Sequence, residues 1–115
     1  MFDRPATGEA AVLVSLNFGA ADYAESRDEL KLLASSAGLD VRAMVEGRRD
    51  RPDARLFAGT GKVEEIGRTL ADSHADIAVF NHELSPAQQR NLERELKCRV
   101  VDRTTLILDI FAQRA

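Results

Sequence analysis

Four short apolar segments alternate along the chain with segments whose apolar residues recur at helical spacing. Residues 10–16 are almost continuously apolar, which is typical of a strand covered on both faces. Residues 77–80 and 99–101 are predicted to form the third and fourth strands. Residues 41–45 alternate more between inward and outward positions, which predicts a partly exposed edge strand.

Helical spacing and capping residues predict a helix after each of these strands. Ser26 begins a capping-box pattern before the first helix, and Gly38 stands where a helix ends with positive φ. Ser85, with Pro86 after it and Gln88 three residues later, predicts the start of the third helix.

The second and fourth helices are predicted mainly from their apolar positions. The second is expected to open near Gly61, with Val63, Ile66 and Leu70 on its inner face. Thr104 or Thr105 is expected to cap the last helix. Its expected inward side chains are Leu106, Ile107, Ile110 and Phe111.

Strands separated by helices of about 10–14 residues predict right-handed βαβ units. The predicted fold class is therefore α/β: three layers, with a short parallel sheet of about four strands and helices on both faces. Residues 1–9 are expected to form a disordered tail and residues 10–115 the domain. The last helix has no glycine cap or other stop signal, so we expect it to be truncated and the chain to be a fragment.

Composition excludes several classes of protein. The chain has 115 residues, of which 44% are hydrophobic and 30% charged, as in a soluble globular domain. One cysteine cannot form an intramolecular disulfide, and no apolar run approaches the ~18–20 residues of a membrane span. A net charge of −3 argues against a uniformly basic nucleic-acid-coating protein but allows a local basic patch.

Positive charge is concentrated between residues 42 and 62. This segment holds six basic and three acidic residues, whereas the rest of the chain holds 10 basic and 16 acidic residues. Arginine side chains bind phosphate with two parallel hydrogen bonds, so a phosphate-binding loop is one interpretation. The expected phosphate contacts are Arg48, Arg49, Arg51, Arg55 and Lys62. The alternative is a solvated loop whose arginines pair with Asp50 and Asp53.

Within this segment, Gly59-Thr60-Gly61-Lys62 stands at a predicted helix start. Glycines allow close backbone approach and a helix N-terminus attracts anions, so these residues are a candidate phosphate loop. The pattern is not a Walker A loop, because Leu56 stands five residues before Gly61 and Val63 follows Lys62. The alternative is a tight turn that needs two glycines.

Other chemistry has little support in the sequence. His74, His82 and Cys98 share no metal-ligand spacing, so no metal site is expected, and Cys98 is interpreted as a small buried residue. His82 and Glu83 could form an acid–base pair, but a loop or capping role is favoured. No catalytic residue is expected in this chain.

Two long segments form a recognisable pattern: residues 83–93, from Glu83-Leu84-Ser85-Pro86 onward, and residues 101–115, which begin Val101-Asp102-Arg103-Thr104-Thr105. They resemble the N-terminal domain of HflX-type GTPases. Residues 48–53 and 57–65 fit the same pattern, so the resemblance covers nearly the whole chain from Ala10.

The resemblance implies a cytoplasmic, ribosome-associated GTPase that binds the large ribosomal subunit and helps to split or rescue ribosomes. Peripheral membrane association is left open. This domain would contact ribosomal RNA and regulate its own GTPase domain in cis. GTP and Mg²⁺ would belong to that missing domain, because the motifs G-x-x-x-x-G-K-[ST], N-K-x-D and D-x-x-G do not occur here.

Two alternatives remain beside a non-catalytic, RNA-contacting domain. One is a small ATP-binding domain that uses the Gly59–Lys62 helix start. The other is a purely structural module that orients the GTPase domain. The sequence does not decide whether Gln88, Gln89 and Arg90 face a partner or only cover their helix.

Overall fold

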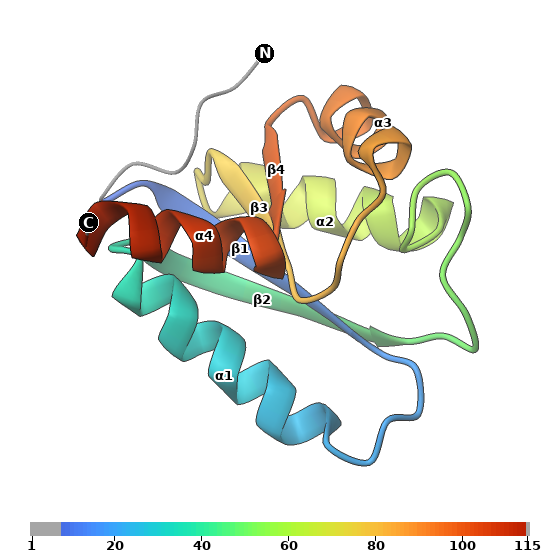
Figure 1. Ribbon diagram of the computed structural model, residues 1–115. Coiled ribbons are helices and arrows are strands. Elements are labelled where there is room, and N and C mark those ends of the chain that lie inside the picture. Colours follow the sequence, from blue (N-terminus) through green and yellow to red (C-terminus); the bar gives the residue numbers. More distant parts are fainter. Residues whose placement is uncertain (1–7, 115) are drawn as a thin grey trace.

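The computed structural model describes residues 8–114 and contains a four-stranded, all-parallel sheet between two layers of helices (Figure 1). In chain order the elements are β1 (Ala10–Asn17), α1 (Tyr23–Ser36), β2 (Asp40–Arg48), α2 (Thr60–Asp72), β3 (Ile77–Phe80), α3 (Pro86–Leu96), β4 (Arg99–Asp102) and α4 (Arg103–Arg114). The predicted α/β class, parallel sheet and strand number are confirmed. Residues 1–7 of the predicted tail lie outside the described residues.

The strand order is β2-β1-β3-β4, so β1 is an inner strand and β2 is an edge. Seven of the eight residues of β1 are buried, as its continuous apolar character predicts. In β2 only Val45 is buried, and the predicted edge position is confirmed. Neighbouring parallel strands place all four carboxyl ends at one edge of the sheet.

Alternate side chains of β1 enter two separate cores. Val12 and Val14 pack with Ile66 on the face covered by α2 and α3. Leu13 packs with Leu106 on the face covered by α1 and α4. Because successive strand residues point to opposite faces, one apolar strand supports both helical layers.

The predicted capping box at Ser26 is wrong. Helix α1 begins three residues earlier, at Tyr23, and its N-cap residue Asp22 makes no side-chain capping bond. Ser26 lies inside the first turns, where its hydroxyl accepts hydrogen bonds from Asn81 Nδ2 at 3.1 Å and Arg103 Nη1 at 3.3 Å. Tertiary contacts therefore occupy the group that the local pattern assigned to capping.

The predicted cap of the last helix is also wrong. Asp102 Oδ1 accepts the backbone N–H of Thr105 at 2.9 Å, so Asp102 caps α4 instead of Thr104 or Thr105. Leu106 and Ile110 are buried, but Phe111 is 66% exposed, against its predicted inward position. Phe111 follows Leu106 by five residues, which turns it about 140° away from that face.

Other predicted boundaries are close to the structure. The Ser85 capping box is confirmed: Ser85 Oγ accepts from Gln88 N, and the Gln88 side chain accepts from Ser85 N. Gly38 has a φ of +83°, as expected for a helix end. Strand β2 continues to Arg48, three residues beyond its predicted end, because its pairing with β1 continues through Asn17.

Candidate functional site

Three connecting segments leave the carboxyl edge of the sheet and form the candidate site. They are residues 18–22 after β1, residues 49–59 after β2, and residues 81–85 after β3. In open parallel sheets ligands bind beyond this edge. Figure 1 shows the long connection between β2 and α2 extending outward from it.

The last residue of β2 and the first residues of the long connection line an open hollow of about 470 Å³, which we call the arginine hollow. Its lining residues are Arg48, Arg49, Asp50 and Arg51. Arg48 and Arg51 are exposed, and neither makes a side-chain hydrogen bond or ion pair within the described part of the chain. Three guanidinium groups beside one carboxylate give this hollow a local excess of positive charge.

Arg49 is partly committed to the loop itself. Its Nη1 donates to the carbonyl of Ala58 at 3.0 Å, and its Nε lies 3.4 Å from the carbonyl of Arg51. The guanidinium lies against Gly59, which has a φ of +83° and forms the N-cap of α2. A Cβ on Gly59 would overlap Arg49 Nη1 and displace the guanidinium, and the positive φ already favours glycine at this position.

The rest of the loop is fixed by Asp53. Its Oδ1 accepts the backbone N–H groups of Arg55 at 2.9 Å and Leu56 at 2.6 Å. These bonds and the nearby arginines hold the pKa of Asp53 below its usual value. Leu56 and Phe57 are buried, so the connection packs against the domain along part of its length.

The other two predicted cations lie apart from the arginine hollow. Lys62 Nζ donates to the carbonyl of Glu46 at 2.9 Å and to Glu65 Oε1 at 2.8 Å. Its stem crosses Gly47, where a Cβ would lie 2.7 Å from Lys62 Cε. Arg55 pairs with Glu95 of α3 at 3.5 Å, and both side chains are exposed.

The candidate phosphate loop is an exposed helix start with few neighbouring atoms. Gly59 precedes α2, Thr60 and Gly61 are exposed, and a Cβ on Gly61 would meet nothing within 4 Å. Lys62 turns toward Glu46 and Glu65, as described above. A phosphate at this helix start would therefore compete with two existing bonds of Lys62.

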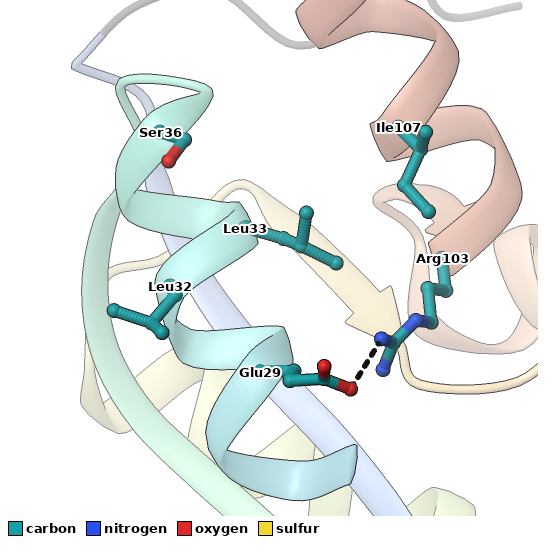
Figure 2. Close-up of a pocket in the computed structure, with 6 residues that line it drawn as sticks. All are labelled: Glu29, Leu32, Leu33, Ser36, Arg103 and Ile107. Atoms are coloured by element: carbon teal, nitrogen blue, oxygen red, sulfur yellow. Dashed lines mark hydrogen bonds and ion pairs between the residues drawn. The ribbon is translucent and has the colours of Figure 1, made fainter.

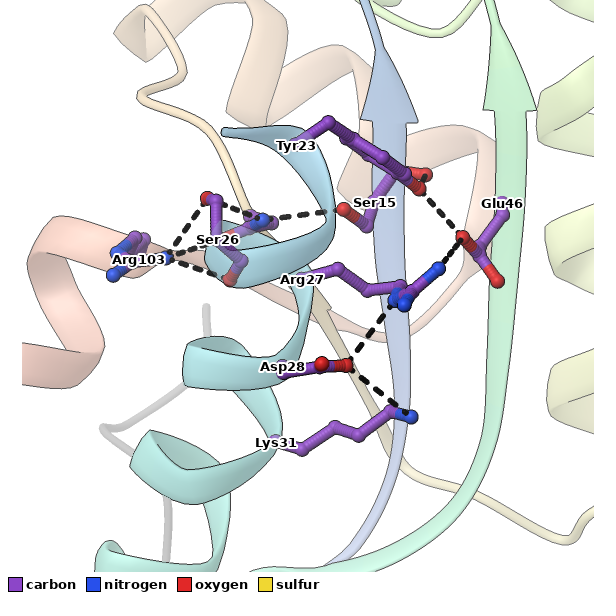
Figure 3. Close-up of polar contacts among 9 residues, drawn as sticks. Ser15, Tyr23, Ser26, Arg27, Asp28, Lys31, Glu46 and Arg103 are labelled. Atoms are coloured by element: carbon purple, nitrogen blue, oxygen red, sulfur yellow. Dashed lines mark hydrogen bonds and ion pairs between the residues drawn. The ribbon is translucent and has the colours of Figure 1, made fainter. Parts of the chain in front are cut away.

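A polar network that the sequence did not predict links α1, α4 and the sheet (Figure 3). Arg103 Nη1 donates to Asn81 Oδ1 at 2.7 Å and to the Ser26 carbonyl at 3.1 Å, while Arg103 Nη2 bonds Glu29. Asn81 Nδ2 donates to Ser15 Oγ at 3.1 Å. The network joins β1, β3, α1 and α4 at the carboxyl edge.

A second part of this network is centred on Glu46. Tyr23 Oη donates to Glu46 Oε1 at 2.6 Å, and Arg27 Nη1 lies 3.3 Å from the same oxygen. The hydrogen bond from Tyr23 lowers the pKa of Glu46, while burial and Glu46 raise the pKa of Tyr23. These residues fix the start of α1 to the edge strand.

His82, which follows β3, is half-buried among aromatic rings. Its Nε2 accepts the backbone N–H of Leu16 at 2.9 Å, and its ring lies 5.3 Å from Phe18 and 5.1 Å from Phe57. Burial, with a contribution from Arg103, lowers the pKa of His82 to about 4. The neutral ring acts as a structural acceptor, which agrees with the favoured loop role.

The structure shows what the glutamines of α3 contact and where Cys98 lies. Gln88 Nε2 donates to the Asp53 carbonyl at 2.8 Å and Gln89 Nε2 to the Val100 carbonyl at 2.9 Å, so both glutamines hold neighbouring segments. Arg90 is exposed. Cys98 is buried, as predicted, and burial raises the pKa of its thiol to about 12.

A separate hollow of about 290 Å³ lies between α1 and α4 (Figure 2). Leu33 and Ile107 face each other across it, and Glu29 and Arg103 pair at one end at 3.0 Å.

Across residues 8–114 there is no group of three His, Cys, Asp or Glu residues that could hold a metal ion. No helix in this range is long and apolar enough to cross a membrane.

Comparison with known proteins gives consistent matches. The family model described as "GTP-binding GTPase N-terminal" matches residues 24–112. GTPase HflX of Escherichia coli (strain K12) is 49% identical over 115 residues, which cover all of this chain and 27% of that protein. GTPase HflX of Flavobacterium psychrophilum is 41% identical over 103 residues, or 90% of this chain and 25% of that protein.

Solved structures agree with these matches. The SsGBP–GDP complex aligns with a TM-score of 0.72 and 25% identity over 95% of this chain and 30% of that chain. A GTP-binding protein from the archaeon Sulfolobus solfataricus, in complex with GDP, shares the fold, with a TM-score of 0.67 and 24% identity over 90% of this chain and 30% of that chain. The chain spans about a quarter of the length of the curated relatives named above.

Proposed function

Because this chain belongs to the HflX GTPase family, in which it matches the N-terminal domain, we propose that it contacts ribosomal RNA of the large subunit. In this proposal the chain is non-catalytic and regulates the GTPase domain of its parent protein, which splits or rescues ribosomes in the cytoplasm. GTP and Mg²⁺ are assigned to the parent's GTPase domain.

The arginine hollow is the observation that supports RNA contact. Arg48 and Arg51 are exposed, with guanidinium groups that no described side chain pairs, on a domain whose net charge is −3. Guanidinium groups form bidentate, charge-assisted hydrogen bonds with phosphate oxygens. We assign Arg48 and Arg51 as the principal phosphate contacts.

The other predicted cations have secondary places in the proposal. Arg49 contributes charge while it holds Ala58 and Gly59 in position. Arg55 and Lys62 are assigned as peripheral contacts, because Arg55 must leave Glu95, and Lys62 must leave Glu46 and Glu65, to bind a phosphate.

Co-sedimentation of the chain with purified large ribosomal subunits, over a series of salt concentrations, tests the proposal. Each phosphate contact contributes roughly 0.7–0.9 to the negative slope of log K against log salt. The double variant Arg48→Ala/Arg51→Ala should therefore bind more weakly and reduce that slope by about 1.5.

A matched control removes the same charge elsewhere. Arg68 of α2 and Arg94 of α3 are exposed and lie outside the hollow, so Arg68→Ala/Arg94→Ala should keep the slope of the parent. Equal loss of binding in both double variants would show a general charge effect and contradict the assignment. Absence of binding at every salt concentration would refute RNA contact by this chain.

ATP binding at the Gly59–Lys62 helix start is the second candidate. It is supported by a helix N-terminus without a side-chain cap and by open space at Gly61. Titration calorimetry with ATP and Mg²⁺ tests it, since a bound nucleotide should give heat that Gly61→Val abolishes. No heat at millimolar ATP would exclude this function.

A further inference from the structure

A small hollow lies where β1 and β3 end side by side. Its volume is about 180 Å³, and we call it the switch-point hollow. Its lining residues are Leu16, Phe18, Ala20, Asp22, Tyr23, Ser26, Asn81 and His82. The chain leaves β1 toward the face of α1 and leaves β3 toward the face of α3, which is the topological switch point where open parallel sheets bind ligands.

Three of the eight residues that line this hollow carry aromatic rings. Phe18 and Tyr23 are half-buried and line it together with the ring of His82. The Phe18 ring stands edge-on to His82 at 80° and to Phe57 at 82°, which fixes its orientation. Fixed rings at a surface hollow provide flat faces on which a planar, uncharged ligand can stack.

His82 adds a hydrogen-bond donor of fixed identity. Its Nε2 accepts from Leu16 N, and the ring is neutral because burial lowers its pKa to about 4, so the hydrogen resides on Nδ1. Nδ1 has no partner among residues 8–114, and it is not among their fully buried unsatisfied atoms. The residues that line the hollow thus include three aromatic rings and an imidazole N–H without a partner among residues 8–114.

The size and position of the hollow select the ligand. Sites for drug-sized ligands occupy roughly 300–1,000 Å³, so this hollow is suited to one ring system and not to a whole nucleotide. Arg49 N donates to the Asn17 carbonyl at 3.0 Å, and Asn17 pairs with Arg48. Phe18 is the next residue, so the aromatic wall begins directly beside the arginine hollow.

We propose that the switch-point hollow receives one unstacked base of a single-stranded RNA whose phosphates contact the arginine hollow. This proposal rests on the RNA contact proposed above and specifies its form. Proteins that recognise single-stranded RNA combine a positively charged path for the backbone with aromatic rings on which bases stack. A continuous duplex, whose bases remain stacked and paired, could not supply such a base.

Fluorescence titration of the chain with a short single-stranded RNA tests the proposal. One base of the RNA is replaced by the fluorescent adenine analogue aminopurine, and stacking on an aromatic ring should quench it. The variant Phe18→Leu keeps an apolar side chain but removes the ring, and it should weaken binding about tenfold. Phe111→Leu, which changes an exposed aromatic on α4, should bind as the parent does.

The possible outcomes separate this proposal from the proposed function. The same RNA annealed to its complement serves as a duplex control. Salt-dependent binding without quenching, or equal affinity for single strand and duplex, would overturn base binding in the switch-point hollow and leave the phosphate contact in place. Absence of RNA binding would overturn both. Free ATP that displaces the RNA at equal concentration would show a mononucleotide site and overturn the single-strand assignment. If Phe18→Leu fails to fold, His82→Gln serves as the second variant. Its fold is checked by circular dichroism, and it should also weaken the quenching.

Discussion

Replacement of Gly59 by alanine should destabilise the domain through two separable effects. Gly59 has φ +83° and ψ 159°, a conformation that is essentially restricted to glycine. Its Cα also lies against the guanidinium of Arg49, so a methyl group would displace Nη1 from the carbonyl of Ala58. The first effect is backbone strain, and the second is the loss of a hydrogen bond with a charged donor.

The two effects have different magnitudes. Backbone strain at such a position costs about 1–3 kcal/mol. A hydrogen bond with a charged donor contributes about 1.5–3 kcal/mol, and the partial exposure of Arg49 reduces this to about 1 kcal/mol. Gly59→Ala should therefore lower the free energy of unfolding by about 2–4 kcal/mol, which leaves a typical domain folded.

A double-mutant cycle measured by urea unfolding tests this account. In the Arg49→Ala background the steric conflict is absent, so Gly59→Ala should cost only the backbone strain. The expected coupling between the two sites is about 1 kcal/mol. If Gly59→Ala costs the same in both backgrounds, the contact with Arg49 is not part of the requirement for glycine.

The remaining predictions concern a titration, an ion pair and a helix cap. The pKa of His82 is 6.5 in the unfolded chain and about 4 in the folded chain, so protonation between these pH values favours the unfolded chain. The urea midpoint should therefore fall as the pH is lowered from 6.5 to 4, and it should fall less in His82→Gln. Lys62→Met keeps the stem over Gly47 but removes the bonds to Glu46 and Glu65, and should cost about 1 kcal/mol by urea unfolding. In co-sedimentation it should bind ribosomal subunits within about twofold of the parent, whereas a loss as large as that of Arg48→Ala/Arg51→Ala would make Lys62 a principal contact. Ser85→Ala should lower the thermal midpoint through a loss of about 1 kcal/mol, and an unchanged midpoint would show that the capping box adds no stability.

The fold was predictable because its signals are local and repeated. The apolar run 10–16 predicts a strand covered on both faces, and Ser85-Pro86 predicts a helix start. The structure confirms both predictions. Ser26 was misassigned because its hydroxyl bonds Asn81 and Arg103, which are distant in sequence. Local patterns cannot show a competition that arises only after the chain folds.

The candidate site was only partly predictable for the same reason. Charge counting located the basic segment, and the structure then separated Arg48 and Arg51, which are open, from Lys62, whose ammonium is bound. The network of Arg103 and Asn81 gave only a weak signal, because single polar residues at strand ends are common. The position of Asn81 directly after a buried strand was the one usable indication.

The strand order has a consequence for synthesis of the chain. β2 pairs with β1, β3 then adds to the free side of β1, and β4 adds to β3. Each later strand therefore pairs with a strand that has already been synthesised. The sheet can therefore grow in the order of translation, without a gap held open for a later strand. Chains arrested after β2 should already contain a paired βαβ unit, and each later pause should add one protected strand.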